Sequence, residues 1–137
     1  MGSSSAQYGL KGRWVRSRKF TFADKNSTKA VLYVPPNTFI PPLGVVCIVT
    51  TLFDGGTPVI DVGDGDNPDG WVDQADITAT AAGSYAGTET NTAAYSGSGK
   101  LYEDADTIDV VLPDEAITAG EGYVLAYMLD VGDVIDD

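Results

Sequence analysis

The chain has 137 residues, a formal net charge of −12, 43% hydrophobic residues and no His. This length fits one domain with its own core, and the hydrophobic content excludes an intrinsically disordered chain. The lack of His excludes Ser-His-Asp and Cys-His nucleophile systems and His-containing zinc sites. We therefore expect no enzymatic activity.

The charge is divided unevenly along the chain. The first 29 residues hold seven of the eight Lys and Arg residues and one acid, which gives +7 − 1 = +6. The remaining 108 residues hold one Lys and nineteen acids, which gives 1 − 19 = −18. An acidic body repels phosphate, so nucleic acid is not an expected partner. No membrane partner is expected either, since a spanning helix needs about 20 apolar residues and no run here is that long.

The N-terminal segment combines basic and aromatic residues. We expect residues 1–17 to form an extended basic arm and residues 18–137 to form a β-sandwich domain. Trp and Arg are enriched at the centres of protein interfaces, which favours a contact with an acidic protein surface. A solvated terminus without a partner is the alternative. The candidate partner-binding residues are Lys11, Arg13, Trp14, Arg16, Arg18 and Lys19.

Alternation of apolar and polar residues predicts the first strands of the domain. One strand would place Phe20 and Phe22 on one face, and a second would follow over residues 29–34. The pairs Pro35-Pro36 and Pro41-Pro42 cannot continue a hydrogen-bonded ladder. We expect this Pro-rich connection to cross between sheets or to cover a sheet edge.

The most apolar stretch is Val45–Phe53, which is rich in β-branched residues. It predicts a central strand buried on both faces, or nearly so. Asp54-Gly55-Gly56 follows, and these residues accept the positive φ angles of hairpin turns. We therefore expect a hairpin with a partner strand over Pro58–Val62. The single Cys, Cys47, lies inside the apolar run and is expected to be an inert buried thiol.

Further short strands are expected over residues 77–82, 100–103, 107–112 and 123–131, with a turn at Ala119–Gly122. Eight or nine short strands at close spacing are typical of all-β proteins. The predicted fold is an antiparallel β-sandwich, jelly-roll-like, with an extended N-terminal arm.

An acidic loop between Gly63 and Trp71 is the candidate site for a small ligand. Carboxylates this close repel one another unless a cation or solvent lies among them, and calcium would suit them. The calcium-loop pattern fails, however, because Pro68 and Asp69 occupy a ligand position and the Gly position. A solvated surface loop without metal is the alternative. The calcium candidates are Asp61, Asp64, Asp66 and Asp69.

Two carbohydrate-related functions follow from the same region. A glycosidase would need paired carboxylates such as Asp61 and Asp73, but exposed turn residues give no reason for a raised pKa. A carbohydrate-binding β-sandwich, with or without calcium in the acidic loop, is the alternative to a purely structural role. Its stacking platforms would be Trp71, Tyr85, Tyr95 or Tyr102.

Three motifs together resemble a known class of proteins. They are the Pro-bounded strand Lys29–Pro36, the apolar strand ending in Phe53-Asp54-Gly55, and Val62-Gly63-Asp64 followed by Asp69-Gly70-Trp71. They resemble small β-rich virion proteins of tailed bacteriophages, including head decoration (cement) proteins, over residues 18–76. The resemblance implies a non-enzymatic viral structural protein on the outer capsid surface, without catalytic residues or cofactor. It also implies a homotrimer that binds the assembled major capsid protein through an extended terminus.

Overall fold

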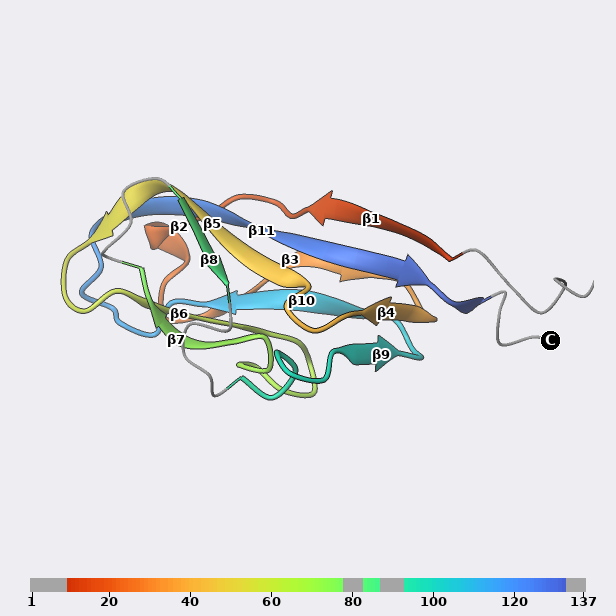
Figure 1. Ribbon diagram of the computed structural model, residues 1–137. Helices are drawn as coiled ribbons and strands as arrows, with labels where there is room; N and C mark the ends of the chain where they lie inside the picture. Colours follow the sequence, from red (N-terminus) through yellow and green to blue (C-terminus); the bar gives the residue numbers. More distant parts are fainter. Residues whose placement is uncertain (1–9, 78–82, 87–92, 133–137) are drawn as a thin grey trace, which may run out of the picture.

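The computed structural model describes residues 10–77, 83–86 and 93–132, and these residues form two antiparallel sheets that pack face to face (Figure 1). The expected all-β sandwich is confirmed. They include the single 3₁₀ turn η2 (Phe22–Asp24). No helix among the described residues is long and apolar enough to span a membrane.

The two sheets differ in size. The four-stranded sheet has the order β3-β10-β6-β7 and consists of β3 (Thr28–Val34), β6 (Val59–Gly63), β7 (Val72–Asp76) and β10 (Asp106–Val111). The seven-stranded sheet consists of β1 (Lys11–Arg16), β2 (Phe20–Thr21), β4 (Thr38–Ile40), β5 (Val45–Asp54), β8 (Gly83–Ala86), β9 (Lys100–Tyr102) and β11 (Ala119–Asp130).

Strand β11 organises the larger sheet, because four other strands pair with it. One edge of β11 pairs with β5 along Ala119–Ala126 and with β4 at Leu129 and Asp130. The opposite edge pairs with β1 along Leu125–Asp130 and with β2 at Glu121 and Gly122. Figure 1 shows β1 lying alongside β11 on the upper side of the molecule. Residues 11–16 of the expected arm are therefore a strand of the sandwich, and residues 1–9 lie outside the described part.

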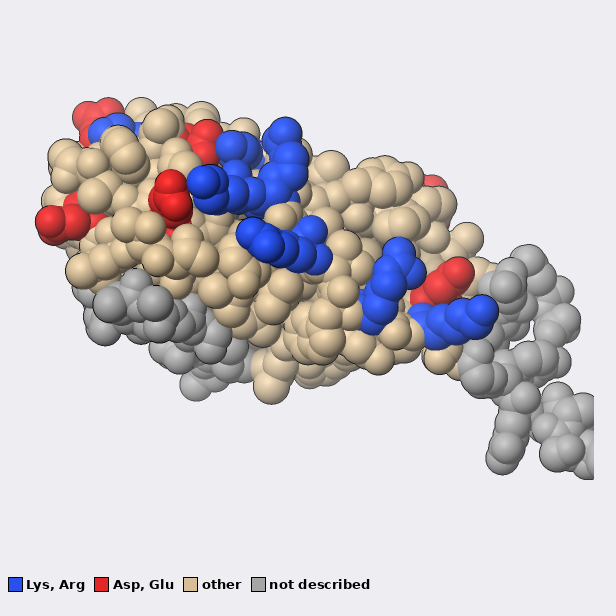
Figure 2. Space-filling model, turned by 90° about the horizontal axis from the view of Figure 1, so that it is seen from above, with Lys and Arg blue, Asp and Glu red and all other residues tan. Residues whose placement is uncertain are grey.

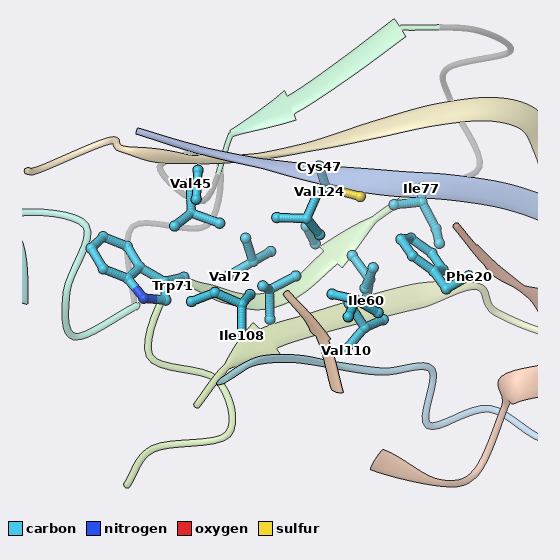
Figure 3. Close-up of a cluster of buried hydrophobic side chains, with 14 of the residues drawn as sticks. Phe20, Val45, Cys47, Ile60, Trp71, Val72, Ile77, Ile108, Val110 and Val124 are labelled. Carbon is cyan, nitrogen blue, oxygen red and sulfur yellow. The ribbon is translucent and has the colours of Figure 1, made fainter. Parts of the chain in front are cut away.

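The core fills the space between the sheets. In Figure 3, Val45, Cys47 and Val124 point from the larger sheet toward Ile60 and Val110 of the smaller one. All five are at most 2% exposed. Burying one Val or Ile side chain contributes about 1.5–3 kcal/mol, so this layer is a main source of stability. Burial also raises the pKa of the Cys47 thiol to about 12, which confirms the expected inert Cys.

The expected hairpin between the strands before and after Asp54-Gly55-Gly56 is wrong. Gly55 and Gly56 do have positive φ, at 88° and 64°, but the turn carries the chain from one sheet to the other. Asp114 holds this crossover, because its carboxylate accepts a hydrogen bond from the Thr57 N–H at 2.6 Å. The two edges of β5 pair with β11 and β8 instead.

Three smaller expectations also need correction. Strand β5 is not buried on both faces: Val46 and Ile48 are only partly buried, and Thr50, Thr51 and Leu52 are exposed. Phe20 is in the core, but Phe22 begins η2 and is 37% exposed. The glycines of Ala119–Gly122 do not form a turn; they lie in β11, where the register with β5 shifts. The Pro35-Pro36 connection does cross between sheets, from β3 to β4, as expected.

Candidate binding surfaces

Strand β1 and the chain that follows it carry all six candidate partner-binding residues. Lys11, Arg13, Trp14 and Arg16 lie on β1, and Arg18 and Lys19 lie between β1 and β2; all six are exposed. Figure 2 shows Lys and Arg side chains lined up along this side of the molecule, with few acidic side chains among them. The sequence-predicted cations are therefore brought together on one surface, which we call the basic edge.

The cations of the basic edge differ in what they contact. Arg18 is partly structural, because its Nη2 donates to the carbonyl oxygen of Ala30 at 2.9 Å and ties the segment to β3. Lys19 forms an exposed ion pair with Glu121 at 3.5 Å. The described residues provide no ion pair for Lys11, Arg13 or Arg16. These last three charges are thus available to a partner.

Trp14 and Arg16 lie on the outer face of the larger sheet, opposite Tyr127 and Leu125 of β11. The Trp14 ring meets the Tyr127 ring edge-on, with 5.3 Å between centroids, and yet it remains 53% exposed. The Arg16 guanidinium lies 4.3 Å from the centre of the Tyr123 ring, a cation–π contact. An exposed Trp beside an Arg is the composition found at the centres of protein interfaces.

The acidic loop is organised around an internal cation, which the sequence analysis missed. Asp64, only 1% exposed, accepts hydrogen bonds from the Tyr102 hydroxyl at 2.6 Å and from Lys100 Nζ at 2.9 Å. Lys100 also donates to Asp66 at 3.0 Å, and Trp71 Nε1 donates to the Tyr102 oxygen at 2.9 Å. The Lys100 ammonium therefore neutralises two of the carboxylates considered for calcium.

The pKa values of this cluster favour its charged form. Burial alone would raise the pKa of Asp64, but hydrogen bonds from Tyr102, Lys100 and the Asn67 N–H outweigh it and hold that pKa below its usual value. Burial would likewise lower the pKa of Lys100, but its hydrogen bonds to Asp64, Tyr95 and Asp66 raise it instead. Lys100 is the one cation after residue 29, which was the available signal for this pairing.

The four calcium candidates fall into two separate carboxylate groups. Within each group the ligand oxygens lie within 4.8 Å of one another, close enough to share a metal ion. The groups among the described residues are Asp64, Asp66 and Asp106, and Asp61, Asp69 and Asp73. The first group contains the two carboxylates that bind Lys100, so a divalent cation would have to displace an ammonium there.

The second group lies beside β6 and β7. Asp61 accepts a hydrogen bond from the Gln74 N–H at 2.8 Å. Its burial, and to a smaller extent the charges of Asp69 and Asp73, raise the pKa of Asp61. The expectation that these turn carboxylates give no reason for a raised pKa is therefore wrong for Asp61. Of the two groups found among the described residues, this one is the better candidate for a divalent cation, because Lys100 binds the other.

Two of the four stacking platforms expected for a carbohydrate-binding protein are buried in the core. Trp71 is 1% exposed and Tyr102 is 2% exposed, because both close one end of the core. Tyr95 is half-buried and packs edge-on against Trp71 at 5.2 Å between ring centroids. For Tyr85, on β8, only the backbone is described. The prediction of a carbohydrate platform is thus wrong for Trp71 and Tyr102.

Comparison with known proteins gives one informative result. No protein-family model matches the chain, and no curated protein sequence matches it. The fold is similar to that of a chain in a solved structure described as "Cyanophage Pam1 capsid asymmetric unit", with a TM-score of 0.56 and 16% identity. The similarity covers 94% of this chain and 95% of that chain. It establishes a shared fold over nearly the whole length of both chains.

Proposed function

We propose that this protein is a non-enzymatic structural component of a tailed-phage virion, a decoration or cement protein on the outer capsid surface. It binds the assembled major capsid protein through its N-terminal segment, with the basic edge as the contact. The observation that carries the proposal is the fold similarity to a chain of a phage capsid structure, which spans both chains almost completely. The resemblance of the sequence motifs at residues 18–76 to small virion proteins of tailed phages points in the same direction.

The charge distribution supports the N-terminal segment as the contact. Lys11, Arg13 and Arg16 have no ion pair among the described residues, whereas the rest of the chain is strongly acidic. An acidic partner surface would be attracted to the basic edge and repelled elsewhere, which fixes the orientation of binding. A ligand that binds the assembled lattice but not free subunits stabilises the assembly.

Self-association as a homotrimer belongs to the same proposal. Several copies joined in one particle would bind an ordered lattice with high effective concentration, so that individually weak contacts suffice. Sedimentation equilibrium or light scattering measures this directly: a mass three times that of the 14.4 kDa chain supports the trimer, and a monomer mass contradicts it.

The test of attachment is co-sedimentation of the purified protein with capsids assembled from the cognate major capsid protein. The wild type should sediment with them, and the triple variant Lys11→Gln, Arg13→Gln, Arg16→Gln should bind about tenfold more weakly or worse, since three unpaired charges are lost. Binding of the wild type should also weaken as salt rises, because exposed charges are screened.

A matched control separates local from overall charge. Ala94, Ala105 and Ala116 are exposed and lie outside the basic edge. Replacing all three with Glu changes the net charge by −3 in total, the same change as in the triple Gln variant. This variant should bind capsids within about twofold of the wild type if the basic edge is the contact. Equal losses in both triple variants would refute the assignment of the basic edge, and a wild type that never sediments with capsids would refute the proposed function.

A further inference from the structure

Strand β1 ends the larger sheet on one side, so one row of its backbone groups has no strand beside it. Among the described residues, β1 pairs with β11 alone, over six residues without a register shift. The next residue, Ser17, donates its N–H to the Val124 carbonyl at 2.8 Å. Because backbone groups in an antiparallel strand alternate sides, Val15, Arg13 and Lys11 also face β11.

The remaining residues of β1 face outward. Gly12, Trp14 and Arg16 therefore direct their N–H and C=O groups to the open side of the sheet. Such an edge is a template for another extended segment, which adds main-chain hydrogen bonds as a new strand. No Pro and no bulge interrupts β1, although these are common devices by which proteins block an edge.

The charges of β1 restrict what can pair there. A second copy of β1 would bring Lys11, Arg13 and Arg16 against the same three cations, and like charges across a strand pair are destabilising. An acidic segment would instead place carboxylates beside cations that have no ion pair among the described residues. The same side chains thus reject self-pairing and select an acidic strand, which is how specificity by charge works.

The two sides of β1 offer different surroundings to such a strand. On the outer face its side chains would meet the exposed Trp14 ring. On the other side, a hollow of about 130 Å³ lies against Arg13, Met128 and Asp130. A segment that alternates acidic and small apolar residues fits both sides, because successive side chains of a strand point to opposite faces.

We infer that β1 binds its partner by strand addition: an extended, acidic segment of another protein pairs with the open edge of β1 through Gly12, Trp14 and Arg16. This rests on the proposed function for the identity of the partner, the capsid lattice. It goes beyond the proposed function in the mode of contact, since attraction between charged side chains alone would need no backbone pairing.

Two variants at Arg16 distinguish backbone hydrogen bonding from side-chain attraction. Arg16→Gln removes the charge and the stacking on Tyr123 but keeps the N–H, whereas Arg16→Pro also removes that outward N–H without breaking a bond to β11. We expect Arg16→Pro to bind at least tenfold more weakly than Arg16→Gln, with equal melting temperatures. A difference below twofold would overturn strand addition while leaving charge-based attachment intact.

Hydrogen exchange provides a second readout that does not depend on a variant. The probe is a synthetic eight-residue peptide of alternating Asp and Val, with a peptide of alternating Lys and Val as the control. The acidic peptide should slow exchange of the Gly12, Trp14 and Arg16 amides at least tenfold and leave the Val15 amide, already bonded to β11, unchanged. Unchanged exchange at all three with saturating acidic peptide would overturn the inference even if the protein sediments with capsids.

The same exchange measurement on capsid-bound protein distinguishes failure of the strand-addition inference from failure of the proposed function. Capsid binding without protection of these amides would refute strand addition alone. Protection by the acidic peptide without any capsid binding would refute the proposed function and keep the acidic-strand site. A protected edge in concentrated protein without peptide would show that a second copy occupies it, which contradicts the argument from like charges.

Discussion

Replacing Lys100 with Met tests whether an internal cation holds the acidic loop. The change keeps most of the aliphatic stem and removes the ammonium that bonds Asp64 at 2.9 Å and Asp66 at 3.0 Å. Asp64 has no exposed side-chain surface, so the variant leaves a buried carboxylate without its counter-charge. Breaking a buried pair in this way costs about 3–5 kcal/mol.

The expected loss is smaller than that range because Asp64 keeps other donors. The Tyr102 hydroxyl and the N–H groups of Asp66 and Asn67 still bond its oxygens, at 2.6, 3.0 and 2.9 Å. We therefore expect a loss of about 2–3 kcal/mol at pH 7, or a melting temperature roughly 6–12 °C lower for a domain of this size. Urea unfolding followed by circular dichroism measures the first quantity and calorimetry the second.

The direction of the Asp64 pKa shift determines how the stability difference between the two proteins changes with pH. Because the pKa of Asp64 is lowered in the folded protein, the wild type has the stability from this group above the ordinary Asp pKa of 3.8 and loses it as pH falls through the lowered value. In Lys100→Met the hydrogen bond and charge that lower the Asp64 pKa against burial are gone, so this pKa is higher than in the wild type. Protonation of Asp64 at low pH therefore costs the variant less stability than it costs the wild type. The difference between the two proteins should shrink below pH 4.

Lys19→Met is the matched control, because Lys19 pairs with Glu121 at 3.5 Å where both side chains are exposed. An exposed pair contributes about 0.2–1 kcal/mol, so the control should change the melting temperature by only a few degrees. Equal effects of the two substitutions, or a loss in Lys100→Met that stays constant from pH 7 to pH 3, would contradict the assignment of Lys100 as the internal counter-ion.

Three further predictions concern the core, the edge and the carboxylates. Trp71→Phe should destabilise the fold by about 2–4 kcal/mol in urea unfolding, whereas Trp14→Phe should change it by less than about 0.5 kcal/mol, since Trp14 is 53% exposed and Trp71 1%. Asp61→Asn should raise the urea midpoint slightly at pH 7 and not at pH 3: a raised folded pKa means that the charged form opposes folding, and protonation removes that opposition. Gly120→Ala should destabilise by at least about 3 kcal/mol in the same assay, because its φ is +129° and a Cβ would meet the Phe53 ring.

The sequence predicted the class of fold because strand signals are local. The β-branched run of β5 and the strand predicted over residues 107–112 each follow from neighbouring residues, and Ile108, Val110 and Leu112 of that segment are buried. Pairing between strands is not local. Gly55 and Gly56 have the positive φ of a hairpin turn, yet nothing nearby in the sequence indicates that β11 occupies the edge of β5.

The same limit applies to the glycines of β11 and to the acidic loop. The sequence predicts a turn at Gly122. In the structure a Cβ at this position would lie 2.6 Å from the Ile48 carbonyl oxygen, so close packing in the sheet requires the glycine. Lys100 lies 36 residues after Asp64, and only the sandwich brings them together. The basic edge was predictable in its composition, since its cations lie close together in the chain. That four of its six residues lie on β1, a strand of the larger sheet, was not predictable.

The six-residue ladder between β1 and β11 has a mechanical consequence if β1 is the point of attachment. A pull directed along β1 would load all of its bonds to β11 together, since they lie perpendicular to the force, instead of opening them one after another. The load would then spread into β5, β4 and β2, which β11 also touches. Such a pull would thus be shared among these strands before β1 separated from β11.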